Sequence, residues 1–126
     1  MNPGLLAQTT VVCLALCGLA AGPAAAAEPL PGYDLDRFCT WAALSEVAAK
    51  PTLDAGAIRQ ACRQREETAL DALKALWPDM PARARSWCSG QVENAVSQVR
   101  APSGSYELLY ECLLDQTVGF VPGWKQ

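Results

Sequence analysis

Hydrophobic residues recur every three to four positions along four segments of the chain, and polar residues fill the positions between them. This spacing is typical of amphipathic α-helices, in which such positions share one face. It predicts helices over residues 34–49, 54–77, 80–99 and 105–118. The expected helix ends are marked by helix-breaking residues: Pro51, Pro78, Pro102 and Gly119. No segment alternates as a strand does.

The start and the inward face of each helix follow from the same pattern. Asp34 is the expected cap of the first helix, and Asp79 that of the third. The first stripe consists of Leu35, Phe38, Ala42 and Ser45. The third consists of Ala84, Trp87, Cys88, Gln91, Val92, Ala95, Val96 and Val99. Three tryptophans lie at or near these stripes and are expected in the core: Trp41, Trp77 and Trp87.

The first 27 residues have a different character. Leu5–Ala27 contains no charged residue, and its apolar run, Val11–Ala21, is about half of the roughly 20 residues that span a bilayer. Small residues follow, so residues 1–27 are interpreted as a signal peptide cleaved after Ala27. A lipidated Cys17 is the competing interpretation, although a lipobox has a small residue where Leu16 stands. The predicted location is the bacterial periplasm or the cell exterior, with no membrane attachment after cleavage.

Cleavage would leave a small, mildly acidic chain. Removing 27 of 126 residues leaves 99, which contain all 10 basic and 13 acidic residues and the net charge of −3. Such a charge does not suit a nucleic-acid partner. Residues 28–119 are predicted to form one domain, and residues 120–126 a C-terminal tail. A domain of this size has little core and gains from covalent cross-links.

Four cysteines remain after cleavage: Cys39, Cys62, Cys88 and Cys112. An even number in a small exported chain indicates two disulfides. A metal site is the alternative, but zinc sites draw on closely spaced cysteines and often on histidine. Here the nearest cysteines are 23 positions apart, and histidine is absent. No metal or cofactor is therefore predicted.

Helix geometry ranks the three possible disulfide pairings. Short connections make successive helices antiparallel. Cys39 and Cys62 lie at similar distances from the first turn, and Cys88 and Cys112 at similar distances from the third. Cys62 and Cys88 are about 12 Å out of level at a rise of 1.5 Å per residue. The sequence predicts Cys39–Cys62 and Cys88–Cys112 in an all-α, compact bundle of about four short antiparallel helices.

Candidate catalytic groups are few. Without histidine, acid–base chemistry falls to carboxylates. Glu66 and Glu67 are adjacent, but neighbouring helical residues point about 100° apart, so both are interpreted as a solvated face, with Glu67 paired to Arg63. Arg65 falls in line with the apolar stripe and is expected to meet a carboxylate such as Glu93 or Glu111, to extend its head to solvent, or to bind a ligand. No enzymatic activity is predicted.

Two features suggest an interaction surface. Glu107, Glu111 and Asp115 form an acidic line at successive turns of the last helix, which a solvated face explains better than a calcium site. Trp124 lies in the tail and either docks on the helices or offers an aromatic side chain to a partner.

The sequence resembles two groups of known proteins. The chain resembles small exported proteins of alphaproteobacteria without assigned function, in motifs that correspond here to Cys62, Glu66, Ala69, Leu73 and Trp77; Arg83, Arg85 and Cys88; and Ser105, Tyr106, Leu109, Cys112 and Leu113. It is more loosely similar to lysozyme inhibitors of the LprI type, through Cys62 to Trp77, Arg85 to Cys88, and Gly104-Ser105 to Cys112-Leu113. The charged, Gln-rich stretch of those inhibitors is missing. The first resemblance implies an exported, disulfide-bonded helical protein, and the second implies inhibition of a cationic enzyme.

From residues and resemblances together, the expected function is that of a non-enzymatic periplasmic module that binds an unidentified protein. Lysozyme inhibition is the alternative. A carrier of a small ligand would require an apolar pocket lined by aromatic side chains.

Overall fold

The computed structural model describes residues 28–118, so the predicted signal peptide and the C-terminal tail lie outside it. Its elements are α1 (Leu35–Ala49), α2 (Ala55–Leu76), the short 3-10 helix η1 (Trp77–Asp79), α3 (Ala82–Gln98) and α4 (Tyr106–Val118). No strand occurs among these residues. The all-α prediction is confirmed.

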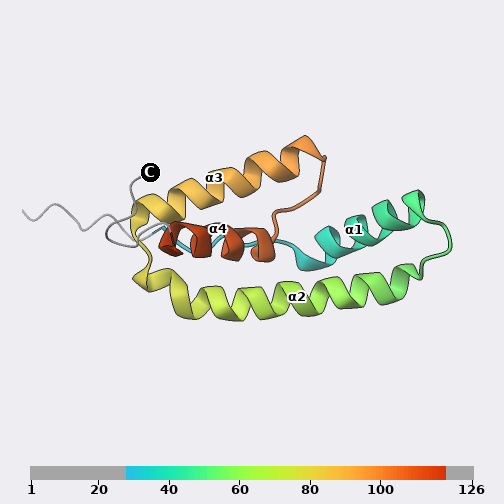
Figure 1. The fold of residues 1–126 in the computed structure, drawn as a ribbon, viewed down its shortest axis with the longest axis horizontal. Coiled ribbons are helices and arrows are strands. Elements are labelled where there is room, and N and C mark those ends of the chain that lie inside the picture. Colours follow the sequence, from blue (N-terminus) through green and yellow to red (C-terminus); the bar gives the residue numbers. More distant parts are fainter. Residues whose placement is uncertain (1–27, 119–126) are drawn as a thin grey trace, which may run out of the picture.

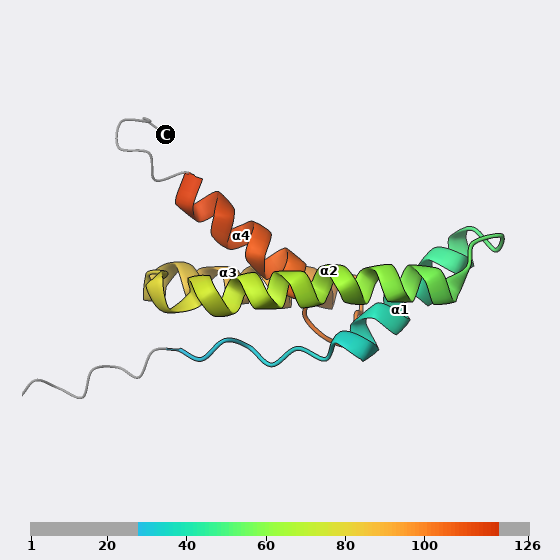
Figure 2. The same ribbon diagram turned by 90° about the horizontal axis from the view of Figure 1, so that it is seen from below.

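Helix α2 is the longest element and organises the others (Figure 1). Helix α1 runs back along its first half, and α4 lies between α2 and α3 and packs against both. The view from below shows α4 crossing the direction of α2 and α3 (Figure 2). Most of the buried apolar side chains belong to α2, α3 and α4, with Trp77 and Met80 closing one end.

Both predicted disulfides are present. Cys39–Cys62 joins α1 to α2 with Cα atoms 5.6 Å apart, and Cys88–Cys112 joins α3 to α4 with Cα atoms 5.7 Å apart. These distances lie within the range that a disulfide requires. In each cross-linked pair the two helices run in opposite directions, as predicted (Figure 1).

The helix ends agree with the predictions at α1 and differ between α2 and α3. The Asp34 carboxylate accepts a hydrogen bond from the Arg37 N–H at 3.0 Å and caps α1. The prediction that Asp79 caps the third helix is wrong. Helix α2 ends at Leu76, one residue before the predicted end at Trp77, and Pro78 lies in the following 3-10 helix η1. Asp79 also belongs to η1, and α3 begins only after Pro81, without a side-chain cap.

The prediction that the tryptophans lie in the core is confirmed for Trp77 and wrong for Trp87. Trp77 is buried and Trp41 is half-buried, whereas Trp87 is 56% exposed. The inward face of α3 is formed by Arg85, Cys88, Ser89 and Val92. The disulfide at Cys88 fixes that face, and Trp87, about 100° away on the helix, turns outward. Ser45 of the predicted α1 stripe is likewise exposed, because Cys39 and Ala43 form the buried face there.

An extended segment before α1 completes the core. We call residues 28–34 the N-terminal strap; it runs back along the helices from the start of α1 (Figure 2). The Trp77 indole N–H donates to the Glu28 carbonyl at 2.8 Å. The Tyr106 hydroxyl donates to the Pro31 carbonyl and accepts from the Tyr33 N–H, both at 2.8 Å. Leu30 and Tyr33 pack on the core, so the strap is part of the fold.

Candidate functional site

Glu66 is the most deeply buried ionisable side chain of the described residues, with 1% of its surface exposed. Its carboxylate accepts hydrogen bonds from the Ser105 hydroxyl at 2.5 Å and from the Tyr106 N–H at 2.6 Å. Ser105 in turn accepts from the Leu108 N–H at 3.3 Å, as an N-cap does. Glu66 of α2 therefore binds the first turn of α4, where N–H groups lack helical partners.

Burial dominates the electrostatics of this group. It raises the pKa of Glu66 although the hydrogen bonds from Ser105 and Tyr106 lower it, since the charged form loses its hydration. The interpretation of Glu66 as part of a solvated face is wrong, because α4 covers it. Its carboxylate is closed to solvent, so in this arrangement it supports the fold and has no access to a substrate. The same interpretation is right for Glu67, which is exposed and pairs with Arg63 at 3.3 Å.

Arg65 lies outside the core, next to the position that Glu66 fills. Its Nε is 3.3 Å from the carboxylate of Glu107, and both side chains are about half exposed. The expected pairing with a carboxylate is correct in kind, but the expected partners, Glu93 and Glu111, are wrong. The reason is that the buried position between Cys62 and Ala69 is taken by Glu66, which turns Arg65 toward the start of α4.

The predicted acidic line is on the surface of α4. Glu107 is half-buried and paired with Arg65, whereas Glu111 and Asp115 are exposed. A surface cleft of about 590 Å³ lies along the junction of α2 and α4, and its lining residues include Glu107, Glu111 and Leu114. Within residues 28–118 no group of three potential metal ligands exists. Trp124, the other predicted interaction residue, lies outside the described residues.

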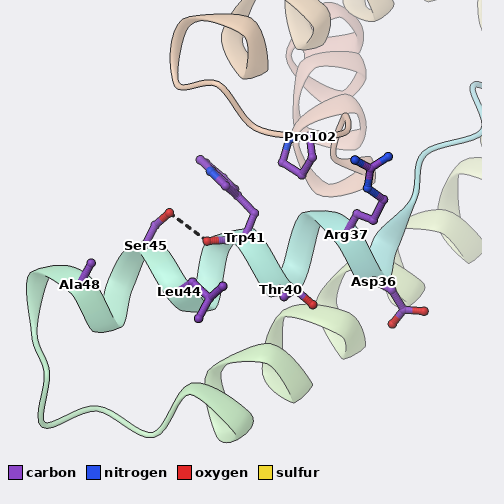
Figure 3. Close-up of a pocket in the computed structure, with 8 residues that line it drawn as sticks. All are labelled: Asp36, Arg37, Thr40, Trp41, Leu44, Ser45, Ala48 and Pro102. Carbon is purple, nitrogen blue, oxygen red and sulfur yellow. Dashed lines mark hydrogen bonds between the residues drawn. The ribbon is translucent and has the colours of Figure 1, made fainter.

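A more apolar groove lies on α1 (Figure 3). We call it the α1 groove; it has a volume of about 610 Å³ and is lined by Asp36, Arg37, Thr40, Trp41, Leu44, Ser45, Ala48 and Pro102. Trp41 and Arg37 point to the same side of the helix, toward Pro102 of the α3–α4 connection. Leu44 is 60% exposed, more than any other large hydrophobic residue of the described range.

The charges at the groove are unequal. Asp36 points away from Trp41 and binds Arg63 of α2 at 2.7 Å. Arg37 is exposed, and within residues 28–118 no salt bridge involves it. The groove therefore presents apolar surface next to one positive charge.

The α1 groove was not predicted, although the sequence held a signal for it. Once Cys39 is paired with Cys62, the buried face of α1 is fixed at Cys39 and Ala43. Trp41, two positions after Cys39, must then lie on the far side of the helix. Hydrophobic periodicity alone does not contain this restraint, and it predicts an inward face of Leu35, Phe38, Ala42 and Ser45.

The residues that carry the first resemblance lie mainly inside the protein. All but Arg83 and Cys112 are buried: Cys62, Glu66, Ala69, Leu73, Trp77, Arg85, Cys88, Ser105, Tyr106, Leu109 and Leu113. They include the Glu66–Ser105 contact and one disulfide. This motif therefore describes how the chain folds and does not mark an exposed site.

Comparison with known proteins identifies no relative from which a function could be inferred. The chain matches no family model, no curated protein and no solved structure. The two resemblances stay predictions. None of the described helices is long and apolar enough to cross a membrane. The α1 groove and the cleft between α2 and α4 are thus the exposed features considered for function.

Proposed function

We propose that this protein is a non-enzymatic, exported module that binds another protein through the α1 groove. The observation that carries the proposal is the exposure of Leu44 beside Trp41 on a helix that is covalently fixed. Large apolar side chains gathered on one surface are typical of interaction sites. Tryptophan is also enriched among the residues that contribute most to binding.

The disulfide makes this surface rigid. Helix α1 has an extensive interface only with α2 among the described helices, and Cys39–Cys62 holds it there. The Trp41 ring also packs on Phe38, with centroids 5.7 Å apart. A side chain that is ordered before binding loses less conformational entropy when a partner arrives.

The groove also limits the chemistry of the partner. Asp36 is neutralised by Arg63, which leaves the Arg37 guanidinium as the charge beside the apolar surface. A complementary segment supplies an apolar side chain for Trp41 and Leu44 and a carboxylate for Arg37, one helical turn away. Arg37 fits such a carboxylate because a guanidinium donates two parallel hydrogen bonds.

The test compares variants in binding assays with proteins of the host's periplasm. Trp41→Ala with Leu44→Ser should abolish retention of a protein that the wild type retains. Trp87→Ala is the matched control, because Trp87 is also exposed but lies on α3. Circular dichroism and intact mass verify the fold and disulfides of each variant. Retention of the same protein by the groove variant would refute the assignment.

The tail is tested in the same experiment. Trp124→Ala should retain the same protein as the wild type if the α1 groove is the site. Loss of that protein with Trp124→Ala alone would transfer the site to the tail. Arg37→Glu should weaken retention, because it places a negative charge opposite the partner's carboxylate.

Lysozyme inhibition is the second candidate, and the acidic surface of α4 favours it. Glu111 and Asp115 are exposed, and no salt bridge within residues 28–118 neutralises them, so they suit a cationic enzyme. The muramidase rate with micromolar protein tests this. Inhibition that is lost in Glu111→Gln with Asp115→Asn would support it, and an unchanged rate with the wild type would exclude it.

Export is tested by the intact mass of the protein produced in its host. The expected mass is that of a chain beginning at Glu28. It should rise by about 4 Da on reduction, since each of the two disulfides takes up two hydrogens. An uncleaved chain with free thiols would contradict both the signal peptide and the oxidising compartment.

A further inference from the structure

The contacts of the N-terminal strap repeat every three residues. The carbonyl groups of Glu28 and Pro31 each accept a hydrogen bond from a side chain of the helical body. The side chains of Leu30 and Tyr33, which are also three positions apart, pack on the core. A polyproline II helix has three residues per turn, so positions three apart lie on the same side of it. The strap thus contacts the body as one face of such a helix does.

The sequence of the strap favours this conformation before the strap docks. Pro29 and Pro31 fix their own φ angles at about −65°, and the residue before each proline is restricted to extended conformations. Residues 28–31 are therefore extended by local sterics alone. A segment that is extended in advance loses little conformational entropy on binding, which is why aromatic-lined grooves bind proline-rich segments.

The surface beneath the strap recognises its backbone. We call this surface the strap groove; it consists of Trp77, Arg85 and Tyr106. The Trp77 indole N–H donates to the Glu28 carbonyl at 2.8 Å, and Arg85 Nη1 lies 3.5 Å from the same oxygen. The Tyr106 hydroxyl donates to the Pro31 carbonyl. Because all three contacts go to main-chain carbonyl groups, a segment of another chain with the same conformation can make them.

The strap uses this groove incompletely. Within the described residues, Arg85 Nε and the Tyr33 hydroxyl are buried and lack a hydrogen-bond partner. Only 6% of Arg85 is exposed. A buried polar group without a partner disfavours the docked state. A segment that supplies an acceptor for Arg85 and carries no hydroxyl in place of Tyr33 therefore binds more tightly than the strap does.

We propose that the strap groove binds an extended, proline-containing segment of another protein, and that the strap occupies the groove until such a segment displaces it. The fitting segment has an apolar side chain in place of Leu30, phenylalanine in place of Tyr33, and a carboxylate that reaches Arg85. Both disulfides lie within the helices, so the strap can leave while the helices stay cross-linked (Figure 2). The site shares no residue with the α1 groove.

A blocked peptide with the strap sequence, Glu-Pro-Leu-Pro-Gly-Tyr-Asp, is the probe for this site. Its binding to the wild type is compared by titration calorimetry with its binding to Leu30→Ser with Tyr33→Ser. These substitutions remove both apolar anchors of the strap and leave the groove intact. Affinity for the variant should be at least about tenfold higher, because the strap no longer competes. Phenylalanine in place of the peptide's tyrosine should increase affinity at least about fivefold.

The Trp77 indole N–H reports directly whether the groove is occupied. Its exchange with solvent, followed by NMR, should be slow in the wild type, fast in the anchor variant, and slow again when the peptide is added. Tyr106→Phe in the anchor variant should weaken peptide binding, and Tyr110→Phe is the matched control. Pro29→Gly with Pro31→Gly provides a second weakened strap, which changes no side chain that packs on the core.

Two results would overturn the proposal. The first is a Trp77 indole that stays protected in both strap variants without peptide, or that regains no protection with peptide at a concentration on the order of millimolar, the effective concentration of a tethered segment. The second is protection that rises with the concentration of the protein alone, since the strap of a second copy would then be the occupant.

Discussion

At the scale of single residues, Glu66 shows how one carboxylate can join two helices. It lies on α2, and both of its hydrogen bonds go to the first turn of α4. A negative charge at a helix N-terminus also interacts favourably with the helix dipole. Against these gains stands the loss of hydration on burial, which raises its pKa. The sign of the net effect can be measured.

We predict that Glu66 makes stability depend on pH in the acidic range. Its pKa in the folded protein is raised above the ordinary value of 4.5, so the folded state binds the proton more tightly than the unfolded state. The resulting stabilisation is complete below pH 4.5 and is lost as pH rises through the raised pKa. The slope cannot exceed about 1.36 kcal/mol per pH unit.

Urea unfolding of wild type and Glu66→Gln over a pH series tests this. The glutamine variant cannot titrate at this position, so the difference in free energy of unfolding, wild type minus variant, should fall as pH rises. A difference that increases with pH would mean that hydrogen bonding outweighs burial. Glu67→Gln is the control, because it makes the same substitution at an exposed position of the same helix.

Gly104 provides a second prediction at this scale. A Cβ atom at this position would overlap the ring of Tyr33, which packs on Tyr106 with centroids 4.9 Å apart. Gly104→Ala should therefore lower the free energy of unfolding by roughly 1–3 kcal/mol, as overpacking does. Urea unfolding measures the change.

Gly90 is the matched control. It lies inside α3, it is exposed, and a Cβ atom added there would have no neighbour within 4 Å. Gly90→Ala should raise the free energy of unfolding by about 0.5–1 kcal/mol, because alanine favours the helix. Equal destabilisation by both substitutions would contradict the packing argument.

The limits of sequence reasoning are clear at this scale. Glu67 and its partner Arg63 follow from helical spacing alone. Glu66 could not be placed in the same way, since its partners are 39 and 40 positions away on another helix. A charged residue is expected to be exposed unless another segment supplies hydrogen-bond donors to its buried form. Those donors come from residues far away in the sequence, so the local pattern does not reveal them.

At the scale of elements, the two disulfides have different tasks. Cys88–Cys112 lies in the core formed by α3 and α4, whereas Cys39–Cys62 fixes α1, which packs mainly on α2. Each closes a loop of 23 or 24 residues and should stabilise the protein by about 3 kcal/mol in the chain-entropy model.

We predict that Cys39→Ser with Cys62→Ser acts locally. Hydrogen exchange should accelerate in α1 while α3 and α4 stay protected, because α1 contributes little to the main core. The binding proposed for the α1 groove should weaken in parallel. Cys88→Ser with Cys112→Ser should instead accelerate exchange throughout the fold. Uniform acceleration in both variants would show that α1 does not open on its own.

Element ends and faces were predictable to different degrees. The helices and their order follow from hydrophobic periodicity and from capping and helix-breaking residues. The disulfides follow from the positions of the cysteines along antiparallel helix axes. The inward face of α3 followed only in part: Cys88 and Val92 of the predicted stripe are buried, but Trp87 is exposed. Trp87 and Val92 both fit an apolar stripe by spacing. Only the covalent restraint at Cys88 decides between them. In the same way, the disulfide at Cys39 places Trp41 on the side of α1 that faces away from α2.

At the scale of the whole molecule, the N-terminal strap closes the core. It was not predicted, because an extended segment with few hydrophobic residues has no periodicity to recognise. In the described part of the chain, three buried polar atoms have no hydrogen-bond partner: Tyr33 Oη in the strap, and Arg85 Nε and Ser89 Oγ in α3. Burial also raises the pKa of Tyr33 to about 12. We expect the strap to open before the helices, because its extended backbone lacks the internal hydrogen bonds of a helix.

Tyr106→Phe tests the strap. The substitution removes the hydroxyl that bonds Pro31 and Tyr33 and should cost about 1–3 kcal/mol. Exchange of the Tyr33 amide should accelerate more than exchange in α2. Tyr110→Phe is the control on the same helix, since no hydrogen bond within residues 28–118 involves its hydroxyl. Equal effects of both substitutions would refute a specific role of Tyr106.

The pairing of each cysteine with its neighbour in sequence has a consequence for biosynthesis. The two covalent loops are consecutive and neither cross nor nest. In the exported chain that the predicted cleavage would leave, without Cys13 and Cys17, emergence of the amino end first presents Cys39 and Cys62 before Cys88 is available. Oxidation in order of emergence therefore forms the native pairs without selection among them. We expect such a chain to require an oxidant but no reshuffling of disulfides, because each cysteine meets its native partner first.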